Sequence, residues 1–144
     1  MNYADFTKNK PLGQYFKPEI YRVIGSARAE VVFEFLREAI EKNRWYLDRS
    51  FDLHELAVRM GGLSEVHWAN AVRMGLRGVT FRQYLVGLRL EYAVELLQKS
   101  TTMNLDEVWR VAGFPSRSSF FRLFKENKGT TPNEYRRKYH QQKR

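Results

Sequence analysis

One stretch near the end of the chain decides the fold: residues 105–136 read LDEVWRVAGFPSRSSFFRLFKENKGTTPNEYR. A short run with helical spacing of apolar residues stops at Gly113, and Ser116 can cap a new helix three residues later. Glycine ends helices because it accepts the left-handed backbone, whereas a serine oxygen caps the free N–H groups of a helix start. Two helices joined by so tight a turn form a helix-turn-helix, with the second helix standing across the first.

The same pattern occurs a second time, upstream of a long helix. Asp52 can cap a short helix that ends at Gly61-Gly62, and Ser64 can cap the helix that follows. One such motif is a weak signal, but two that flank one long helix are much rarer by chance. A further helix is expected earlier in the chain, at about 27–43. The apolar residues of this helix, of the first motif and of the long helix repeat with helical spacing, and we expect them on buried faces: Val32, Phe35, Leu36, Ala39, Ile40, Leu53, Leu56, Ala57, Met60, Trp68, Ala71, Val72, Phe81, Tyr84, Leu85, Leu88, Ala93, Leu96 and Leu97.

The sequence therefore predicts an all-α fold of about seven helices, with two helix-turn-helix subdomains joined by a long central helix. The expected parts are a first motif at about 52–78, a linker helix at about 80–100, a second motif at about 104–128 and a last helix at about 132–140. Pro132 suits the start of that last helix. Residues 27–144 form the predicted domain, and residues 1–26 are expected to be an N-terminal linker or accessory segment.

Composition excludes several classes of protein. The 144 residues suit one compact domain. The absence of cysteine excludes a disulfide scaffold, thiol catalysis and a cysteine-based zinc site. No apolar run reaches the roughly 18–20 residues that cross a bilayer, and the first ten residues lack the apolar core of a signal peptide. We therefore expect a soluble, cytoplasmic protein with no membrane segment in this chain.

Positive charge is concentrated at the C-terminal end. The formal net charge is +9, and residues 116–144 hold nine basic and two acidic side chains. A localised basic face attracts a polyanion, and nucleic acid is the commonest such partner. From charge alone a solvated tail and an anionic membrane surface remain alternatives.

The sequence contains none of the common motifs that indicate an enzyme. The histidines, His54, His67 and His140, share no metal-ligand spacing. The chain also lacks a phosphate-binding loop, a dinucleotide fingerprint, H-E-x-x-H and G-x-S-x-G. We therefore expect no enzyme activity, no metal and no cofactor.

The stretch at 105–136 resembles the C-terminal signature of the AraC/XylS family of transcription regulators. The matching residues are Val108, Gly113-Phe114, Ser116, Ser119-Phe120, Arg122, Phe124-Lys125, Gly129, Thr131-Pro132 and Tyr135-Arg136. Leu53-x-x-Leu56-Ala57 resembles the family's first motif. Its linker helix is matched by Gly78-x-x-Phe81-x-x-Tyr84-Leu85, Arg89-Leu90-x-x-Ala93 and Leu96-Leu97.

The resemblance covers about 27–139 and implies a bipartite domain for double-stranded DNA. Its two recognition helices would enter successive major grooves on one side of the duplex. A helix of about 20 residues is ~30 Å long, close to the ~34 Å repeat of the major groove. Two departures stand out: Trp109 replaces the family's usual small alanine and should repack or point elsewhere, and residues 61–78 lack the usual basic-Phe-Lys sequence.

On the helix after Ser116, the 3.6-residue period predicts an outer face that can read bases and an inner face, Phe120 and Phe124, that lies in the core. The base-reading candidates are Arg117, Ser118, Phe121 and Arg122, and the phosphate candidates are Ser116, Lys125 and Lys128. Arginine can bind guanine O6 and N7 in a bidentate manner, and an apolar ring can contact a thymine methyl. The alternative is that the arginines are ordinary surface residues and Phe121 is buried.

On the helix after Ser64, the predicted outer face is poorer in groups that read bases. Val66 and Asn70 are the base-reading candidates, while Ser64 and Arg73 are the phosphate candidates. The alternative is that this helix binds DNA weakly or not at all. The second motif is therefore expected to dominate affinity, and Arg136 is expected to be structural.

Taken together, these features predict a sequence-specific regulator of transcription that binds double-stranded DNA. The alternative is a helical protein-interaction module with a basic face that binds DNA only non-specifically. A steep loss of affinity with salt would favour DNA. A separate sensing or dimerisation domain, or a protein partner, remains open.

Overall fold

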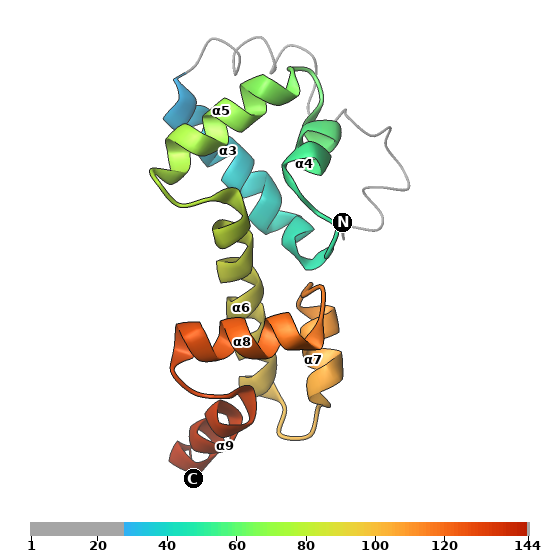
Figure 1. The fold of residues 1–144 in the computed structure, drawn as a ribbon, viewed down its shortest axis with the longest axis vertical. Coiled ribbons are helices and arrows are strands. Elements are labelled where there is room, and N and C mark those ends of the chain that lie inside the picture. Colours follow the sequence, from blue (N-terminus) through green and yellow to red (C-terminus); the bar gives the residue numbers. More distant parts are fainter. Residues whose placement is uncertain (1–27, 144) are drawn as a thin grey trace. The chain divides into compact units, whose positions relative to one another are not determined.

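The structure of the protein is a computed structural model that describes residues 28–143. Over these residues the chain is all-α and contains no strand, as the sequence predicts. The predicted segment 1–26 lies outside the described residues. The helices are α3 (Ala29–Lys42), α4 (Leu53–Met60), α5 (Glu65–Leu76), α6 (Phe81–Lys99), α7 (Leu105–Val111), α8 (Arg117–Lys128) and α9 (Pro132–Gln142), with a 3-10 turn at Trp45–Leu47 (Figure 1).

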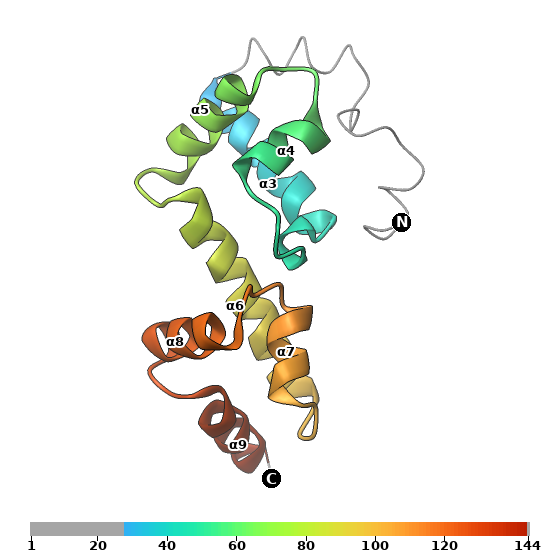
Figure 2. The same ribbon diagram turned by 45° about the vertical axis from the view of Figure 1, so that its right-hand side comes forward.

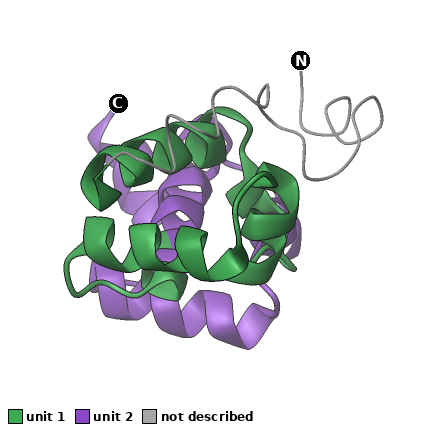
Figure 3. Ribbon diagram, turned by 90° about the horizontal axis from the view of Figure 1, so that it is seen from above, with its two compact units in different colours: residues 1–84 green, residues 85–144 purple. Residues whose placement is uncertain are grey.

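The chain divides into two compact units, residues 1–84 and 85–144, which Figure 3 colours green and purple. The first unit contains the α4–α5 motif and the second contains the α7–α8 motif. The α6 helix begins in the first unit and continues in the second.

The predicted N-caps Asp52, Ser64 and Ser116 are confirmed, and Asn104 and Thr131 cap their helices in the same way, each by a side-chain oxygen that accepts a backbone N–H from the first turn. The pairs, cap first, are Asp52 with Glu55, Ser64 with His67, Asn104 with Asp106, Ser116 with Ser119, and Thr131 with Glu134. Thr80 and Gln83 exchange reciprocal hydrogen bonds at the start of α6. The helix starts are thus fixed by local chemistry.

Helix ends rely on left-handed backbone. Gly113 has φ +86° in the turn before α8, a conformation that glycine adopts without steric cost. At the end of α5 the left-handed residue is Arg77, with φ +51°, directly before Gly78. A residue with a Cβ rarely takes this conformation.

In the first unit, α3 packs closely against α5. A Cβ at Gly75 would overlap the Cβ and Cγ atoms of Phe33, so only glycine permits this approach. Phe33 is buried, whereas Phe35 is only half-buried. The prediction that Phe35 lies on the buried face is therefore wrong, because Phe33 takes the contact with α5. The remaining predicted core residues, such as Trp68, are buried, except for six that are half-buried: Leu53, Ala57, Phe81, Tyr84, Leu88 and Leu96.

A buried arginine links the 3-10 turn to α4. Arg59 donates hydrogen bonds to Asp48 at 2.8 Å and to Glu55 at 3.1 Å. Its guanidinium carbon lies 4.8 Å from the ring centroid of Phe51 and 5.5 Å from that of Trp45. Buried charge is tolerated only when it is paired, and two carboxylates supply the pairing here.

The second unit has a core of aromatic rings on the inner face of α8. Phe120 lies 5.1 Å from Phe114 and 5.7 Å from Phe124, between ring centroids, and Phe124 lies 5.8 Å from Tyr135 of α9. The buried members of this core come from α6, α7, α8 and the turn before α8 (Figure 2): Leu90, Ala93, Leu97, Val108, Ala112, Phe114, Phe120 and Phe124. The inner face of α8 was predicted correctly.

Candidate nucleic-acid interface

The outer face of α8 is basic and exposed. The side chains of Arg117 and Arg122 are 61% and 58% exposed, and Ser118 and Lys125 are exposed beside them. Lys128 is exposed at the end of the helix. Ser118, Arg122 and Lys125 lie on the side of the helix that faces away from its buried phenylalanines. Arg117 and Lys128 are exposed because they are the first and last residues of the helix, although the helical period places them nearer the side of Phe124.

Phe121 departs from the predicted placement. It is half-buried and packs against the core, with its ring centroid 5.5 Å from that of Phe120. It follows Phe120 by one residue, so it borders the inner face rather than standing clear of it. Phe121 is therefore half-buried, between the predicted place on the exposed outer face and the alternative in which it is buried. The guanidinium carbon of Arg117 lies 4.8 Å from its ring centroid.

Arg117 is also bound to an aspartate of α7. Its Nη1 donates to Asp106 Oδ1 at 2.7 Å, and Trp109 Nε1 donates to the same oxygen at 3.0 Å. The Trp109 hydrogen bond, together with the hydrogen bond and charge of Arg117, lowers the pKa of Asp106, so this carboxylate is ionised at neutral pH. Trp109 is half-buried against the core, which is how its bulk is accommodated.

Sequence reasoning missed Asp106. The three-residue spacing from Asp106 to Trp109 could have indicated their contact on one helix. The ion pair with Arg117 joins two different helices across the turn, and the helical period within one helix cannot predict such a contact.

The two serine candidates are engaged as caps. Ser64 accepts the backbone N–H of His67, and Ser116 accepts that of Ser119 while its hydroxyl donates to Ser119 Oγ at 3.0 Å. Each therefore marks a helix N-terminus, where free backbone N–H groups favour an anion such as phosphate.

The outer face of α5 has a different character. Val66 is 78% exposed, and the exposed Asn70 accepts a hydrogen bond from Arg73 Nη2 at 2.8 Å. These residues line a largely apolar hollow of about 520 Å³ in the first unit. It is lined by Leu53, Val66, Ala69, Asn70, Val72, Arg73, Leu76, Gly78, Val79, Thr80 and Phe81. Arg73 is the single cation of that lining, and no carboxylate joins it.

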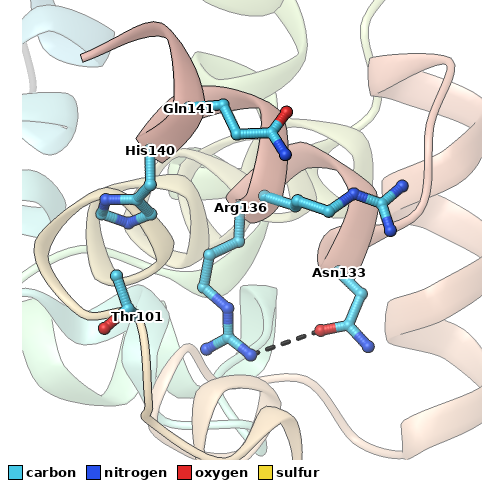
Figure 4. Close-up of a pocket in the computed structure, with 6 residues that line it drawn as sticks. Thr101, Asn133, Arg136, His140 and Gln141 are labelled. Carbon is cyan, nitrogen blue, oxygen red and sulfur yellow. Dashed lines mark hydrogen bonds between the residues drawn. The ribbon is translucent and has the colours of Figure 1, made fainter. Parts of the chain in front are cut away.

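A hollow of about 430 Å³ beside α9 is built from polar side chains (Figure 4). Arg136, one of its two arginines, donates to the Met103 carbonyl at 2.6 Å and to Asn133 Oδ1 at 3.3 Å. His140 Nε2 lies 2.9 Å from the Leu97 carbonyl oxygen. These contacts hold α9 to its own unit, in line with the expected structural role of Arg136.

No cluster of three or more His, Asp or Glu side chains that could hold a metal ion occurs among residues 28–143. Within the same residues, no helix has the length and apolar content needed to cross a membrane.

Two capped helix-turn-helix motifs, one with a basic outer helix, define the class of double helix-turn-helix domains. A family model described as a helix-turn-helix domain matches residues 57–138. The chain belongs to the AraC/XylS family of transcription regulators, as its sequence signature indicates. This is a family of regulators and not of enzymes.

Curated relatives agree with this assignment. The chain is 31% identical over 118 residues to the HTH-type transcriptional regulator YijO of Escherichia coli K12, covering 81% of this chain and 39% of the relative. It is 30% identical over 122 residues to the virulence regulon transcriptional activator VirF of Shigella flexneri, covering 81% and 42%. The chain thus spans about two fifths of the length of these relatives.

Solved structures show the same fold. The C-terminal domain of AraT, a response regulator from Geobacillus stearothermophilus, matches with a TM-score of 0.64 and 26% identity, over 78% of this chain and 88% of that one. The C-terminal domain of the two-component response regulator yesN from Fusobacterium nucleatum matches with a TM-score of 0.60 and 28% identity, over 73% and 97%.

Proposed function

We propose that this chain is the DNA-binding part of a transcription regulator and recognises a specific double-stranded sequence. The observation that carries the proposal is the outer face of α8, where Arg117, Arg122 and Lys125 lie exposed on a helix whose other side is fixed in an aromatic core. Cations on a rigid helix combine attraction to phosphate with a fixed presentation of hydrogen-bond donors to base edges.

The outer side chains of α8 divide by chemistry into two groups. Arg117, Ser118 and Arg122 can hydrogen-bond to base edges, and the half-buried edge of Phe121 can contact a thymine methyl. Lys125 and Lys128 lie toward the end of the helix, where a flexible ammonium suits phosphate. We assign phosphate also to the helix start at Ser116.

The α5 helix takes the lesser share in this proposal. Val66 and Asn70 would meet base edges, and Arg73 and the helix start at Ser64 would meet phosphate. The 19 residues of α6 extend about 28 Å at 1.5 Å per residue. This length supports binding in successive major grooves, which repeat every ~34 Å.

A second candidate function rests on the hollow beside α5. Val66 is 78% exposed in a largely apolar lining, a composition typical of protein-binding surfaces. Under this reading the first motif binds a partner protein, and DNA binding is non-specific. A partner protein or a separate sensing or dimerisation domain would deliver the regulatory signal under either reading. Since the relatives are bacterial, the proposed site of action is the cytoplasm.

The test is selection of sites from a random duplex library by this chain alone, at near-physiological salt. Enrichment of two short blocks about one helical turn apart is the expected result, whereas a single block would confine base reading to one motif. No enrichment, with binding that is lost as salt rises, would favour the protein-interaction module. The logarithm of the binding constant for the selected site should fall linearly with the logarithm of the salt concentration, with a slope set by the number of phosphates contacted.

A further inference from the structure

A carboxylate lies directly beside the recognition surface of α8. Asp106 Oδ1 accepts hydrogen bonds from Arg117 Nη1 at 2.7 Å and from Trp109 Nε1 at 3.0 Å, and its side chain is 39% exposed. The backbone N–H of Asp106 is in turn held by Asn104 Oδ1 at 2.8 Å. Asp106 is thus fixed from its own helix on two sides and reaches across the turn to one arginine.

The carboxylate of Asp106 cannot increase the affinity for DNA of every sequence. A negative charge close to phosphates repels them, so its presence weakens attraction to any sequence alike. Exposed ion pairs also contribute little to stability. The effect that remains is geometric: Asp106 restricts where the guanidinium of Arg117 can point.

The restraint leaves the reading edge of Arg117 available. A guanidinium has five N–H donors, and the contact with Asp106 Oδ1 uses one of them. Phe121 adds a second restraint, because the guanidinium carbon lies 4.8 Å from its ring centroid. These two contacts, one to a donor N–H and one to the guanidinium carbon, limit the orientations that the group can take. Guanine O6 and N7 require such a planar pair of donors.

We propose that Asp106 is a positioning residue that presents Arg117 to a guanine, so that α8 reads a G·C pair at the position Arg117 faces. The inference rests on the proposed function, since it names one base pair within the site that α8 would read. Trp109 contributes to the positioning of Arg117 because its indole N–H holds the Asp106 carboxylate in place.

The chain contains a matched control on the same helix. Arg122 also has a carboxylate partner, Glu126, but at 3.5 Å. That pair is exposed on both sides, and it lies within one helix rather than across the turn. Glu126→Gln therefore removes a similar negative charge from the same surface without releasing Arg117.

The experiment measures binding of the full chain to the site obtained by selection. Each guanine in turn is replaced by 7-deazaguanine, which lacks N7. For the wild-type chain, the guanine that Arg117 contacts should show a loss of about 10- to 150-fold, the range of one hydrogen bond to a charged group, because this analogue removes N7 and keeps O6. Arg117→Ala should abolish that position-specific loss.

Asp106→Ala should reduce the loss at that position to less than about threefold, while affinity for duplexes without the guanine stays the same or rises. The double variant with Arg117→Ala should lose no further discrimination. Trp109→Phe should give an intermediate loss, and Glu126→Gln should leave the discrimination unchanged. Far-UV circular dichroism checks that each variant is folded, and Asp106→Leu, which has a similar size and no acceptor, repeats the test if the alanine variant unfolds.

Three results would overturn the inference and leave the proposed function standing. The first is wild-type discrimination that survives in both Asp106 variants, and the second is a selected site at which 7-deazaguanine has no effect. The third is sharper discrimination in Asp106→Ala, which would make the carboxylate a competitor of DNA. A wild-type chain that selects no sequence at all would overturn the proposed function together with this inference.

Discussion

The two helix-turn-helix motifs contain the same cross-helix pair with opposite polarity. In the first motif, the second residue of α4, His54, lies 2.9 Å from the first residue of α5, Glu65. In the second motif, the second residue of α7, Asp106, lies 2.7 Å from the first residue of α8, Arg117. The turn brings these positions together in both cases, and the residue types decide which helix carries the cation.

The exposed faces of α5 and α8 also differ in charge, and again the second motif has its cations on the second helix. The α8 helix presents Arg117, Arg122 and Lys125, whereas α5 presents a highly exposed Val66 beside a single arginine, Arg73. Caps and buried faces are alike in the two motifs. The capping residues and the buried residues therefore determine that each segment folds as a helix-turn-helix. The exposed residues of the second helix do not affect the fold, so they can differ between the motifs according to what each motif binds.

The largest effect should come from the shared inner faces. Phe120→Ala in α8 and Trp68→Ala in α5 each remove a fully buried aromatic side chain. Each should lower the free energy of unfolding of its own unit by about 3–5 kcal/mol. Amide hydrogen exchange, read helix by helix, distinguishes the two units. If one substitution were tolerated, the two motifs would not be equivalent even in their cores.

Next in size is the contrast between two arginines. Arg122→Ala should cost about 1–3 kcal/mol of binding free energy on the preferred site and relax the preference at one base pair. Arg73→Ala should weaken binding to every sequence by a similar, smaller amount, because a phosphate contact carries no sequence information. Fluorescence anisotropy with matched and mutated duplexes measures both. Equal loss on all sequences would reassign Arg122 to phosphate, and no change would remove α5 from the DNA.

A smaller effect should separate the two readings of the hollow beside α5. If Val66 contacts thymine methyls, replacing thymine by uracil at the base pairs facing α5 should weaken binding by about 0.8 kcal/mol, or about fourfold, for each methyl lost. Val66→Thr, which keeps the shape and adds a hydroxyl, should reduce this difference. Competition binding with uracil-substituted duplexes provides the measurement. Insensitivity to uracil would instead leave the hollow to a protein partner.

The smallest expected effect is a change of stability with pH, because the cation of the cross-helix pair is a histidine in the first motif and an arginine in the second. The hydrogen bond and charge of Glu65 raise the pKa of His54 above its usual value. The contribution of this pair to stability is therefore fully present below about pH 6.5 and is lost as the pH rises through the raised value. Asp106 has a lowered pKa, so its pair persists across that range. Thermal unfolding at pH 5.5 and 8 should show this difference in the wild type and lose it in His54→Gln.

Much of the fold was predictable because its signals are local. Caps such as Asp52 and Ser116, and buried faces such as Phe120 with Phe124, depend on residues one to four positions apart. Phe33 was missed because its partner, Gly75, lies 42 positions away in the sequence, and nothing in the period of α3 distinguishes it from Phe35.

The candidate site was predictable only in part. The helical period placed Arg117 and Arg122 on the outer face, but it could not show that Phe121 borders the core or that Asp106 holds Arg117. These are contacts between elements, and they depend on how the turn aims α7 and α8. The roles assigned to individual side chains at the DNA remain predictions.

The left-handed Arg77 at the end of α5 has a consequence for protein engineering. A residue with a Cβ sacrifices about 1–2 kcal/mol in this conformation, and glycine avoids that loss at the expense of about 0.5–1 kcal/mol of backbone entropy. Arg77→Gly should therefore raise the melting temperature slightly while it deletes an exposed cation next to the proposed DNA-binding helix. A screen for thermal stability should therefore favour glycine at this position. The DNA affinity of the same variant would show whether the charge of Arg77 matters for binding.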